Sequence, residues 1–566
     1  MSFFYLTNLP KYGKIYEYVY ILRSERNIMK ENQTKGILSS KLYLYLTEFF
    51  AGMSVMAVEL GASRLLAPYF SSSQIVWTII IGTIMIAMAL GNYFGGKSAD
   101  KDPDPDRLYK RVLLSAVWIA AIPFVGKMVI LGVSALLVVT ISTNFLIWAA
   151  FLACMIVFVF PLFLLGTVTP SLVKYTTDSL DDNGKTVGTL GAFNTVGSII
   201  GTFAPTFITI PSVGTSVTFL IFSGILLALG LVYFISCKRS TVRVIVCTVL
   251  FLICCVVSTR LGFAFWEKGL TFEGESVYNY LQVKENDKEV ALSTNVLFGI
   301  QSIYMKDGGL TGLYYDTAMA APLMSDGEDI SSKNMLILGM GTGTYAKQCR
   351  TYFDGINVEG VEIDDKITDL AHEYFELDSD IKVTTYDGRA FLQAVNRKNE
   401  VKYDVIMVDA YQDITIPFQM SSVEFFSLVR DALKPGGVMV VNMNMHSDKE
   451  GSINDHLSDT IASVFSEVYI TPVHGTTNRE LFASNDKAMT EHFRKNIQSL
   501  KDADLKALMQ DVSTDMQRYE SGGRLLTDDK APVELLGMEV IDDLISDELQ
   551  YYKKAFKEDG IKGITS

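Results

Sequence analysis

The sequence predicts a protein of two parts: an N-terminal α-helical transmembrane bundle, and a C-terminal α/β domain preceded by a small antiparallel β-sheet. Residues 42–259 contain long apolar runs that are nearly free of charge, whereas residues 265–566 have an ordinary globular composition. In the second part, short apolar runs alternate with helical patterns, which is typical of a parallel sheet covered by helices. The first of these runs ends in a glycine-rich turn at 339–343.

Composition argues against several classes of protein. The chain has 566 residues, so more than one domain is expected. Its formal net charge of −14 comes largely from the C-terminal part, which argues against a nucleic-acid partner. The six cysteines show no CxxC spacing, and four of them lie between residues 237 and 255. Neither a disulfide framework nor a zinc site is therefore expected.

The membrane bundle is expected at 42–260, because a bilayer-spanning helix needs about 20 apolar residues. Clear candidates are 42–61, 75–95, 145–170, 187–210, 216–236 and 241–259. The stretch 112–141, which Pro123 and Lys127 interrupt, is either one overlong helix or two short spans that meet near Gly126. The bundle therefore has seven or eight helices, and we favour eight.

Basic residues predict the orientation of this bundle. The N-terminal arm 1–41 carries seven Lys or Arg residues and the loop 96–111 carries five, so both are expected in the cytoplasm. With eight spans the C-terminal domain is cytoplasmic as well. We therefore predict a multi-pass protein of the inner cell membrane, with the lipid bilayer as a partner. The basic loop 238–243 then faces outward, against the charge rule.

Glu59 lies near the end of the first span, five residues before Arg64. An ionisable group inside a membrane is costly, and it is usually paired or functional. We expect a structural ion pair between these two residues rather than a role in transport.

The C-terminal part begins with three short β-rich runs, which predict a small antiparallel sheet within 265–320. These runs are 276–284, 290–294 and 300–305. The α/β domain is expected at 321–550, with strands near residues 335, 358, 382, 404 and 438. The region 453–548 contains both helical and strand patterns, whose order the sequence leaves open.

Side chains at the carboxyl ends of four of these strands predict a ligand site. Glycines after a strand let a ligand approach the backbone, and the following helix N-terminus favours electron-rich groups. Glu362 follows the glycine turn at 339–343 by about 20 residues, where a carboxylate suits the two hydroxyls of a ribose. Asp387 and Asp409 end the next two strands, at the edge where open α/β sheets bind ligands. An adenosine-containing ligand is the resulting hypothesis, although a tight turn also needs glycine without any ligand.

Together these residues resemble the spermidine synthase family, the aminopropyltransferases built on the AdoMet-methyltransferase (Rossmann-like) fold. The resemblance covers roughly residues 270–550. Its markers are Glu275-Ser276-Val277-Tyr278, Asp307-Gly308, the turn at 339–344, Val361-Glu362-Ile363-Asp364, Asp387-Gly388 and the strand 403–409. The membrane half resembles the multi-span domain fused to such enzymes in some bacteria. The matching phrases there are Glu59-Leu60, Arg64-Leu65-Leu66-Ala67-Pro68, Pro161 with Gly166, and the run 91–97.

The resemblance implies that decarboxylated AdoMet or AdoMet binds as a co-substrate. Glu362 would hold the ribose hydroxyls and Asp387 the adenine amino group, whereas Asp364 is expected to hold the turn after Glu362. The further binding candidates are Asn279, Gly339, Gly341, Thr342, Gly343 and Gly388. No metal is required, because the sulfonium carries its own positive charge. The partner would be a small amine or another nucleophile, and a homodimer is left open because soluble relatives commonly pair.

The catalytic candidates depart from the family pattern. Asp409 stands where the family has the first acid of its Asp-x-x-Asp loop, but the place of the second acid is taken by Gln412, followed by Asp413. Tyr314 matches a tyrosine of the amine pocket, whose histidine is lost here. The acid of the family's glycine turn is replaced by Thr342. A polyamine pocket should be rich in carboxylates, and this one has lost several.

Three functions therefore stay open. The first is a membrane-anchored aminopropyltransferase that releases methylthioadenosine. The second is an enzyme that acts on AdoMet itself, by methyl transfer or AdoMet cleavage, because Thr342 removes a repulsion that a ligand carboxylate would meet. The third is a membrane transporter or sensor whose soluble domain binds a nucleoside without turning it over.

Overall fold

The computed structural model describes residues 40–540 except for seven short stretches, so the predicted arm 1–41 lies almost entirely outside the described residues. The stretches left out are 71, 141–143, 177–182, 297–298, 399–401, 411–415 and 445–448. The chain divides into two compact units. The first unit comprises 1–62, 80–129 and 154–261, and the second comprises 63–79, 130–153 and 262–566.

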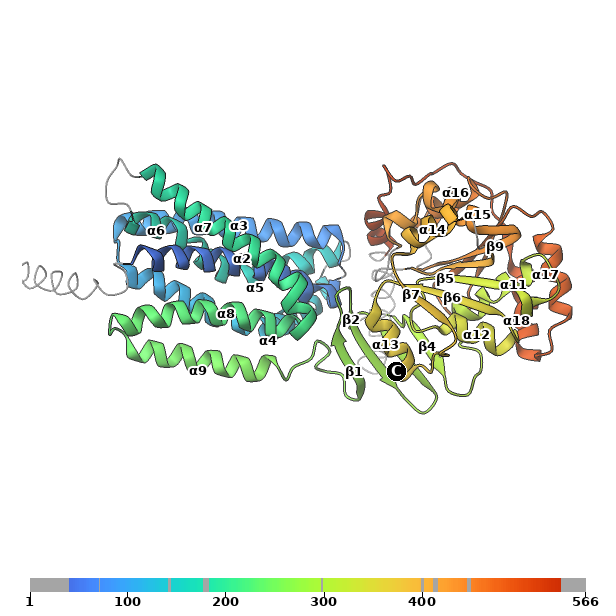
Figure 1. The fold of residues 1–566 in the computed structure, drawn as a ribbon, viewed down its shortest axis with the longest axis horizontal. Coiled ribbons are helices and arrows are strands. Elements are labelled where there is room, and N and C mark those ends of the chain that lie inside the picture. The colour runs from blue at the N-terminus through green and yellow to red at the C-terminus, as the bar shows by residue number, and fades with distance from the viewer. Residues whose placement is uncertain are drawn as a thin grey trace, which may run out of the picture. The chain divides into compact units, whose positions relative to one another are not determined.

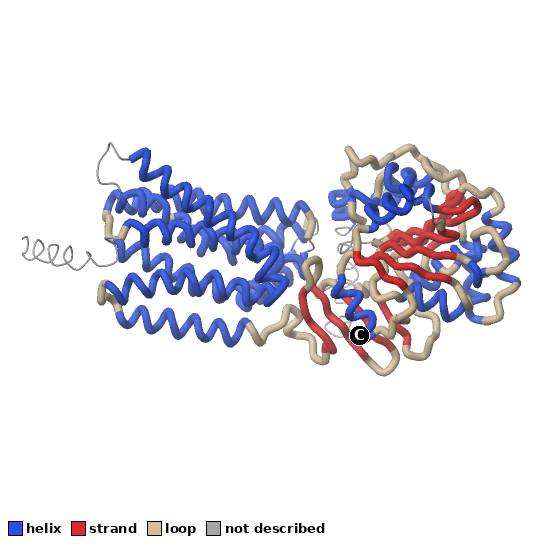
Figure 2. The backbone as a smooth tube through the Cα atoms, in the orientation of Figure 1, coloured by secondary structure: helices blue, strands red, loops and turns tan. Residues whose placement is uncertain are grey.

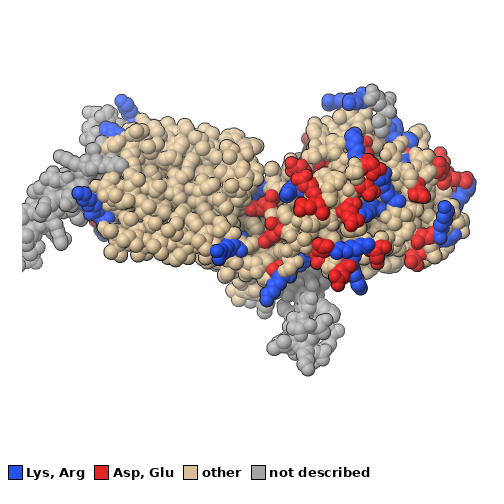
Figure 3. Space-filling view, turned by 60° about the horizontal axis from the view of Figure 1, so that its bottom comes forward, with Lys and Arg blue, Asp and Glu red and all other residues tan. Residues whose placement is uncertain are grey.

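Long helices make up the N-terminal part, as Figures 1 and 2 show. They are α2 (Lys41–Phe70), α3 (Gln74–Lys101), α4 (Pro105–Thr140), α5 (Phe145–Gly166), α6 (Val168–Thr176), α7 (Asn183–Ala204), α8 (Ile210–Ser236) and α9 (Thr241–Ser258). Within the described ranges, six helices are long and apolar enough to cross a membrane, and α7 and α8 count there as one helix over Gly184–Ser236. Figure 3 shows almost no charged side chains over the middle of these helices.

The structure corrects the predicted division of residues 112–141. This stretch lies in one continuous helix, α4, so its interpretation as two short spans is wrong. Pro123 lies inside α4 without ending it. The buried Lys127 also fits within the helix, because its Nζ donates to the Leu261 carbonyl oxygen at 2.9 Å. The favoured count of eight helices depended on this division and loses its basis.

Helices α7 and α8 run in opposite directions along α2. Pairs of contacting residues show this: Gly197 and Gly201 of α7 face Phe49 and Met53 of α2, whereas Phe222 and Leu229 of α8 accept hydrogen bonds from Ser54 and Tyr43 of α2. Residue numbers along α7 rise in the same direction as those along α2, whereas residue numbers along α8 rise in the opposite direction. The chain reverses around Gly214, whose φ of +78° is not helical. Counting α5 with α6 as one, and α7 and α8 separately, the described helices of this part form seven long segments.

The predicted ion pair between Glu59 and Arg64 is absent. The Arg64 guanidinium donates instead to main-chain oxygens, those of Ser276 at 2.9 Å and Tyr278 at 3.1 Å. These residues belong to the same compact unit. Arg64 therefore holds the turn before β2 rather than a membrane carboxylate.

The small antiparallel sheet is confirmed and has four strands. They are β1 (Leu270–Glu275), β2 (Tyr280–Glu285), β3 (Glu289–Ser293) and β4 (Ser302–Met305), paired in this order. The sequence missed β1, and the predicted run 276–284 begins as a turn. The Ser276 hydroxyl accepts the backbone N–H groups of Tyr278 (3.1 Å) and Asn279 (2.8 Å), which bends the chain before β2.

The second sheet has eight strands in the order β12-β10-β11-β9-β8-β5-β6-β7. They are β5 (Asn334–Leu338), β6 (Asn357–Glu362), β7 (Lys382–Thr385), β8 (Tyr403–Val408), β9 (Leu433–Met443), β10 (Glu467–Pro472), β11 (Arg479–Ser484) and β12 (Gln517–Arg518). The first five are parallel, as predicted, and β11 lies antiparallel to β9. This Rossmann-like order leaves a crevice at the carboxyl ends of β5 and β8, where the chain changes direction across the sheet.

Helices cover both faces of this sheet (Figures 1 and 2). They are α10 (Tyr314–Ala318), α11 (Ala320–Met324), α12 (Thr344–Tyr352), α13 (Asp365–Tyr374), α14 (Gly388–Lys398), α15 (Val423–Ala432), α16 (Ile453–Ala462), α17 (Met489–Gln498) and α18 (Ala503–Asp515). Successive strand residues enter different cores: Ile337 and Val440 pack in one, and Leu336 and Val441 in the other. Near-continuous apolar strands are typical of a sheet buried on both faces.

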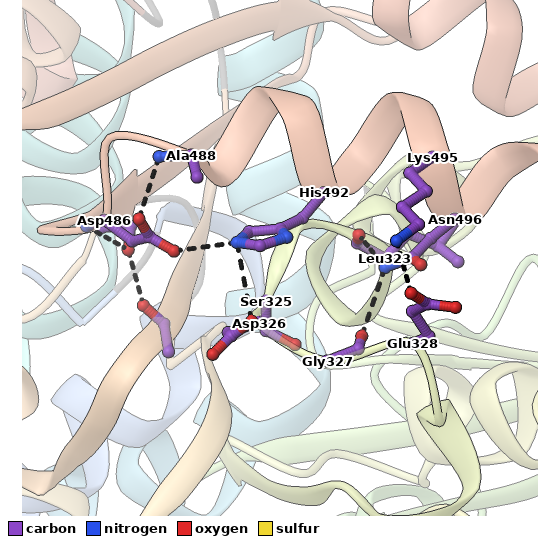
Figure 4. A network of polar contacts seen from close by, with 12 residues as sticks. Leu323, Ser325, Asp326, Gly327, Glu328, Asp486, Ala488, His492, Lys495 and Asn496 are labelled. Carbon is purple, nitrogen blue, oxygen red and sulfur yellow. Dashed lines mark hydrogen bonds and ion pairs between the residues drawn. The ribbon is translucent and has the colours of Figure 1, made fainter.

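Polar contacts fasten α17 to the segment that follows α11 (Figure 4). The His492 Nε2 lies 3.1 Å from the Asp486 carboxylate and 3.6 Å from that of Asp326. One turn later, the Asn496 side chain donates to the Leu323 carbonyl oxygen at 2.9 Å. These contacts fix the helical layer that covers α11 and the neighbouring strands.

Candidate active site

A cavity of about 340 Å³ lies at the carboxyl ends of β5, β6 and β8. Seven of the predicted site residues line it: Asn279, Gly339, Gly341, Glu362, Asp387, Gly388 and Asp409. The fold thus brings together residues that the sequence places on separate strands and on the small sheet. Apolar side chains, among them Leu292 and Met420, complete the lining. A cavity with an apolar lining and a few convergent polar groups suits a small-molecule ligand.

The glycine turn supports one wall of this cavity. Gly339 has a φ of +84°, and a β-carbon there would lie 2.5 Å from the Asp409 carbonyl oxygen. Only glycine therefore fits between β5 and the end of β8. Two residues later, the Gly341 N–H donates to Glu362 Oε2 at 2.9 Å. The turn and the end of β6 are thereby joined.

Glu362 is held in place by backbone donors on both of its oxygens. Its Oε1 accepts the Asp364 N–H at 3.1 Å, while its Oε2 accepts the Gly341 N–H. Burial raises the pKa of the Glu362 carboxyl, and these N–H groups oppose the rise. A carboxylate oriented in this way still presents lone pairs to the cavity for ligand hydroxyls.

Asp364 holds the turn after Glu362, as expected. It accepts hydrogen bonds from the Ser276 hydroxyl at 2.5 Å and the Asn279 amide at 2.9 Å, and it caps α13 through the Lys366 N–H at 3.1 Å. The fully buried Asp364 carboxylate therefore holds the Asn279 side chain at the cavity.

Asp387 and Gly388 form the third edge of the site. The Asp387 Oδ1 accepts the Ala390 N–H at 2.7 Å, so this side chain begins α14 as well as lining the cavity. Gly388 lies against Met420, where an added β-carbon would approach the Met420 methyl group to 3.3 Å. The carboxylate is thus positioned by the helix that it caps.

Among the residues that line this cavity, Asp409 is the carboxyl group whose surroundings shift its pKa most. Tyr314 donates its hydroxyl to Asp409 Oδ2 at 2.6 Å, and the Asn442 amide donates to Oδ1 at 3.1 Å. Burial raises the pKa of Asp409 to about 7, assisted by the charge of Glu362, although both hydrogen bonds oppose this rise. A carboxyl group with a pKa near neutrality can accept a proton from a substrate.

Some predicted residues do not line the cavity. The Thr342 side chain is buried, and the Thr342 backbone N–H donates to the Ser302 hydroxyl at 3.1 Å. Gly343, with a φ of +87°, begins α12. Neither residue is among those that line the cavity, and their role as binding residues stays a prediction. Tyr314 acts on the site through Asp409, whereas Gln412 and Asp413 lie outside the described residues.

Sequence reasoning missed three polar residues near Asp409. Asn442 lies on β9 and Glu480 on β11, directly opposite each other. The Asn478 amide donates to Asn442 Oδ1 at 2.8 Å and so fixes the orientation of the Asn442 amide toward Asp409. The available signal for Asn442 was a polar residue within the apolar run Val-Val-Asn-Met, whereas Glu480 follows Asn478 and Arg479 and gave no such signal.

Comparison with known proteins agrees with this arrangement. Residues 313–495 match the Spermine/spermidine synthase domain. A protein of Bifidobacterium longum named "Probable polyamine aminopropyl transferase" is 52% identical over 356 residues, which cover 60% of this chain and 78% of that protein. This chain belongs to the polyamine aminopropyltransferase family. Its members are transferases, which favours an enzyme over a transporter or sensor domain without catalytic activity.

More distant relatives share shorter parts of the chain. A polyamine aminopropyltransferase of Vibrio vulnificus is 26% identical over 216 residues, covering 36% of this chain and 70% of that protein. The crystal structure of a probable spermidine synthase from Corynebacterium glutamicum is similar with 18% identity and a TM-score of 0.33, covering 45% of this chain and 97% of that one.

Proposed function

We propose that this chain transfers the aminopropyl group of decarboxylated AdoMet to a small amine and releases methylthioadenosine. The observation that carries the proposal is Asp409, a carboxylate of pKa about 7 that lines the cavity beside Glu362 and the glycine turn. The polyamine aminopropyltransferases to which the chain is similar support the same reaction.

The donor would be held by the residues that line the cavity. Glu362 lines the cavity at the end of β6 and can accept hydrogen bonds from the two ribose hydroxyls. Asp387 can accept a hydrogen bond from the adenine amino group, and Gly341 leaves the backbone open to the ligand. The sulfonium tail then points toward Asp409, whose carboxylate attracts its positive charge.

The chemical step is a displacement at the carbon next to the sulfonium sulfur. The amine nitrogen forms a bond to this carbon, the carbon–sulfur bond breaks, and its electron pair stays on sulfur as a neutral thioether. The nitrogen must first lose the proton that makes it an ammonium, and Asp409, which lines the cavity, can accept this proton. Tyr314 and Asn442 hold both oxygens of Asp409, so the acceptor nitrogen meets a fixed base.

Intact AdoMet is the second candidate donor. Thr342 carries no charge, and its hydroxyl oxygen has no hydrogen-bond partner among the described residues. The carboxylate that the family has at this position is therefore missing, together with the repulsion that it would exert on the carboxylate of AdoMet.

We also propose that the chain is anchored in the cell membrane by seven passes. An odd number of passes lies between the basic loop 96–111 and the C-terminal domain, and an odd number also lies between the basic loop 238–243 and that domain. Both loops therefore lie on the same side of the membrane. An odd count puts that domain on the other side from these loops. The charge rule then favours an extracytoplasmic domain, against our expectation of a cytoplasmic one, which required eight passes.

The proposed reaction is tested with purified chain, decarboxylated AdoMet or AdoMet, and 1,4-diaminobutane. Methylthioadenosine and the aminopropylated amine should form in equal amounts from the decarboxylated donor only. Methylthioadenosine from AdoMet alone, without an amine, would instead support cleavage of AdoMet. Absence of any product from either donor would overturn the proposal.

A further inference from the structure

Glu480 is a buried carboxylate in the middle of the sheet, on β11. Its side chain is 0% exposed, and neither of its oxygens has a hydrogen-bond partner among the residues that the structure describes. Burying a carboxyl group without hydrogen bonds is costly, and such a group is normally neutral or paired with a cation. Burial raises the pKa of Glu480 well above its ordinary range, and the charge of Asp409 adds to the rise. A positively charged ligand would relieve both costs.

Strand register places Glu480 in a polar row across the sheet. Glu480 on β11 lies opposite Asn442 on β9 and opposite Thr471 on β10. Directly opposite residues of antiparallel strands point to the same face. Asn442 in turn donates to Asp409 at the end of β8. The row therefore runs Asp409, Asn442, Glu480, Thr471, with the two carboxylates about 10 Å apart at their backbones, which is two strand spacings.

A second cavity lies at the far end of this row. It measures about 170 Å³ and is lined by Thr471 together with the acidic residues Asp316, Asp511 and Asp515. The Thr471 hydroxyl is fully buried and also has no hydrogen-bond partner in the described part of the chain. Glu480 and Thr471, which have no hydrogen-bond partner among the described residues, thus lie between Asn442 and an acid-lined cavity, an arrangement that suits a ligand with separated positive charges.

We propose that Glu480 binds the far ammonium group of a diamine acceptor while the near amine meets Asp409. This role rests on the proposed aminopropyl transfer and names the residue that selects a dication over a monocation. Asn442 lies between the two carboxylates in the strand register, and two strand spacings are within the reach of an amine chain of a few methylenes. The loss of acids from the family's loop and glycine turn is offset here by an acid on β11.

The test compares two acceptors that differ only in the second charge, 1,4-diaminobutane and 1-aminobutane, with decarboxylated AdoMet as donor. In Glu480→Gln the KM for the diamine should rise about 10- to 100-fold, the value of a hydrogen bond to a charged group. The KM for the monoamine and the KM for the donor should stay unchanged. Glu480→Asp, which keeps the charge, should retain the preference for the diamine.

Glu467→Gln is the matched control, because Glu467 lies at the other end of the β10–β11 hairpin and pairs with Arg518. It should leave both KM values unchanged. If Glu480→Gln raises the KM equally for both amines, or raises neither KM, the role of Glu480 is overturned while the proposed reaction stands. A native chain that uses both amines with the same KM would overturn it without any variant. A native chain that binds the donor but makes no product with either amine would overturn the proposed reaction, and this role with it.

Discussion

The hydrogen bond from Tyr314 to Asp409 allows a direct test of how the site sets the ionisation of its base. Replacing Tyr314 by Phe removes the hydroxyl that donates to Asp409 Oδ2 at 2.6 Å. The ring should stay in place, because it lies against Tyr315 with 4.0 Å between the ring centroids. The change therefore removes one donor from the carboxylate and little else.

The magnitude follows from the strength of such a bond. A hydrogen bond to a charged group contributes about 1.5–3 kcal/mol, and each pKa unit corresponds to about 1.4 kcal/mol. Losing the donor disfavours the ionised form, so the pKa of Asp409 should rise from about 7 to about 8–9. Activity requires the ionised carboxylate and is lost as the pH falls through this pKa. The acid limb of kcat/KM should accordingly move upward by about 1–2 pH units.

The assay is methylthioadenosine release from decarboxylated AdoMet and 1,4-diaminobutane between pH 5.5 and 10. The amine ionises identically with every variant, so a displacement between two profiles reports the protein. Tyr315→Phe is the control, because the Tyr315 hydroxyl donates to the Gln301 carbonyl oxygen and not to Asp409. A Tyr314→Phe profile that superimposes on that of the native chain would refute the reasoning.

Three further predictions concern the glycine turn, the stability that is lost by burying Asp409, and the number of membrane passes. Gly339→Ala should abolish most activity, because its β-carbon would lie 2.5 Å from the Asp409 carbonyl oxygen, and unchanged turnover would contradict this. Asp409→Asn should raise the Tm of the ligand-free protein, because between about pH 4 and about pH 7 the folded native chain keeps a proton on Asp409 that the unfolded chain releases. The gain in stability should therefore grow over this pH range and then level off. A gain that does not depend on pH would count against a raised pKa of Asp409. Cysteines introduced at Asp102 and Thr241 should react with an impermeant maleimide from the same side of the membrane, and one at Glu520 from the other side; identical labelling of all three would exclude seven passes.

Much of the C-terminal fold could be predicted because its signals are local. Five apolar runs gave the parallel strands, and carboxylates that follow such strands gather at one edge of the sheet by geometry alone. Glu362, Asp387 and Asp409 were found in this way. Asp364 was also placed correctly, since a residue just after the strand end caps the next helix.

The remaining features depend on contacts that have no local signal. Asn442 and Glu480 meet only through the antiparallel register of β9 and β11, which the sequence does not specify. The strand β1 was missed because Leu-Thr-Phe-Glu-Gly-Glu alternates over only four residues and contains two glutamates and a glycine, which are uncommon in strands. The stretch 112–141 was divided because Pro123 suggested a break that α4 does not contain.

The central claim is that Asp409 accepts the proton of the attacking amine. Its most direct test is the rate of methylthioadenosine release by Asp409→Asn at pH 8, with the donor and 1,4-diaminobutane both saturating and donor binding confirmed by calorimetry. Loss of a general base predicts a rate lower by about 10²- to 10⁴-fold, while the donor still binds. A rate within a few-fold of the native chain would contradict the claim and move the base elsewhere in the site.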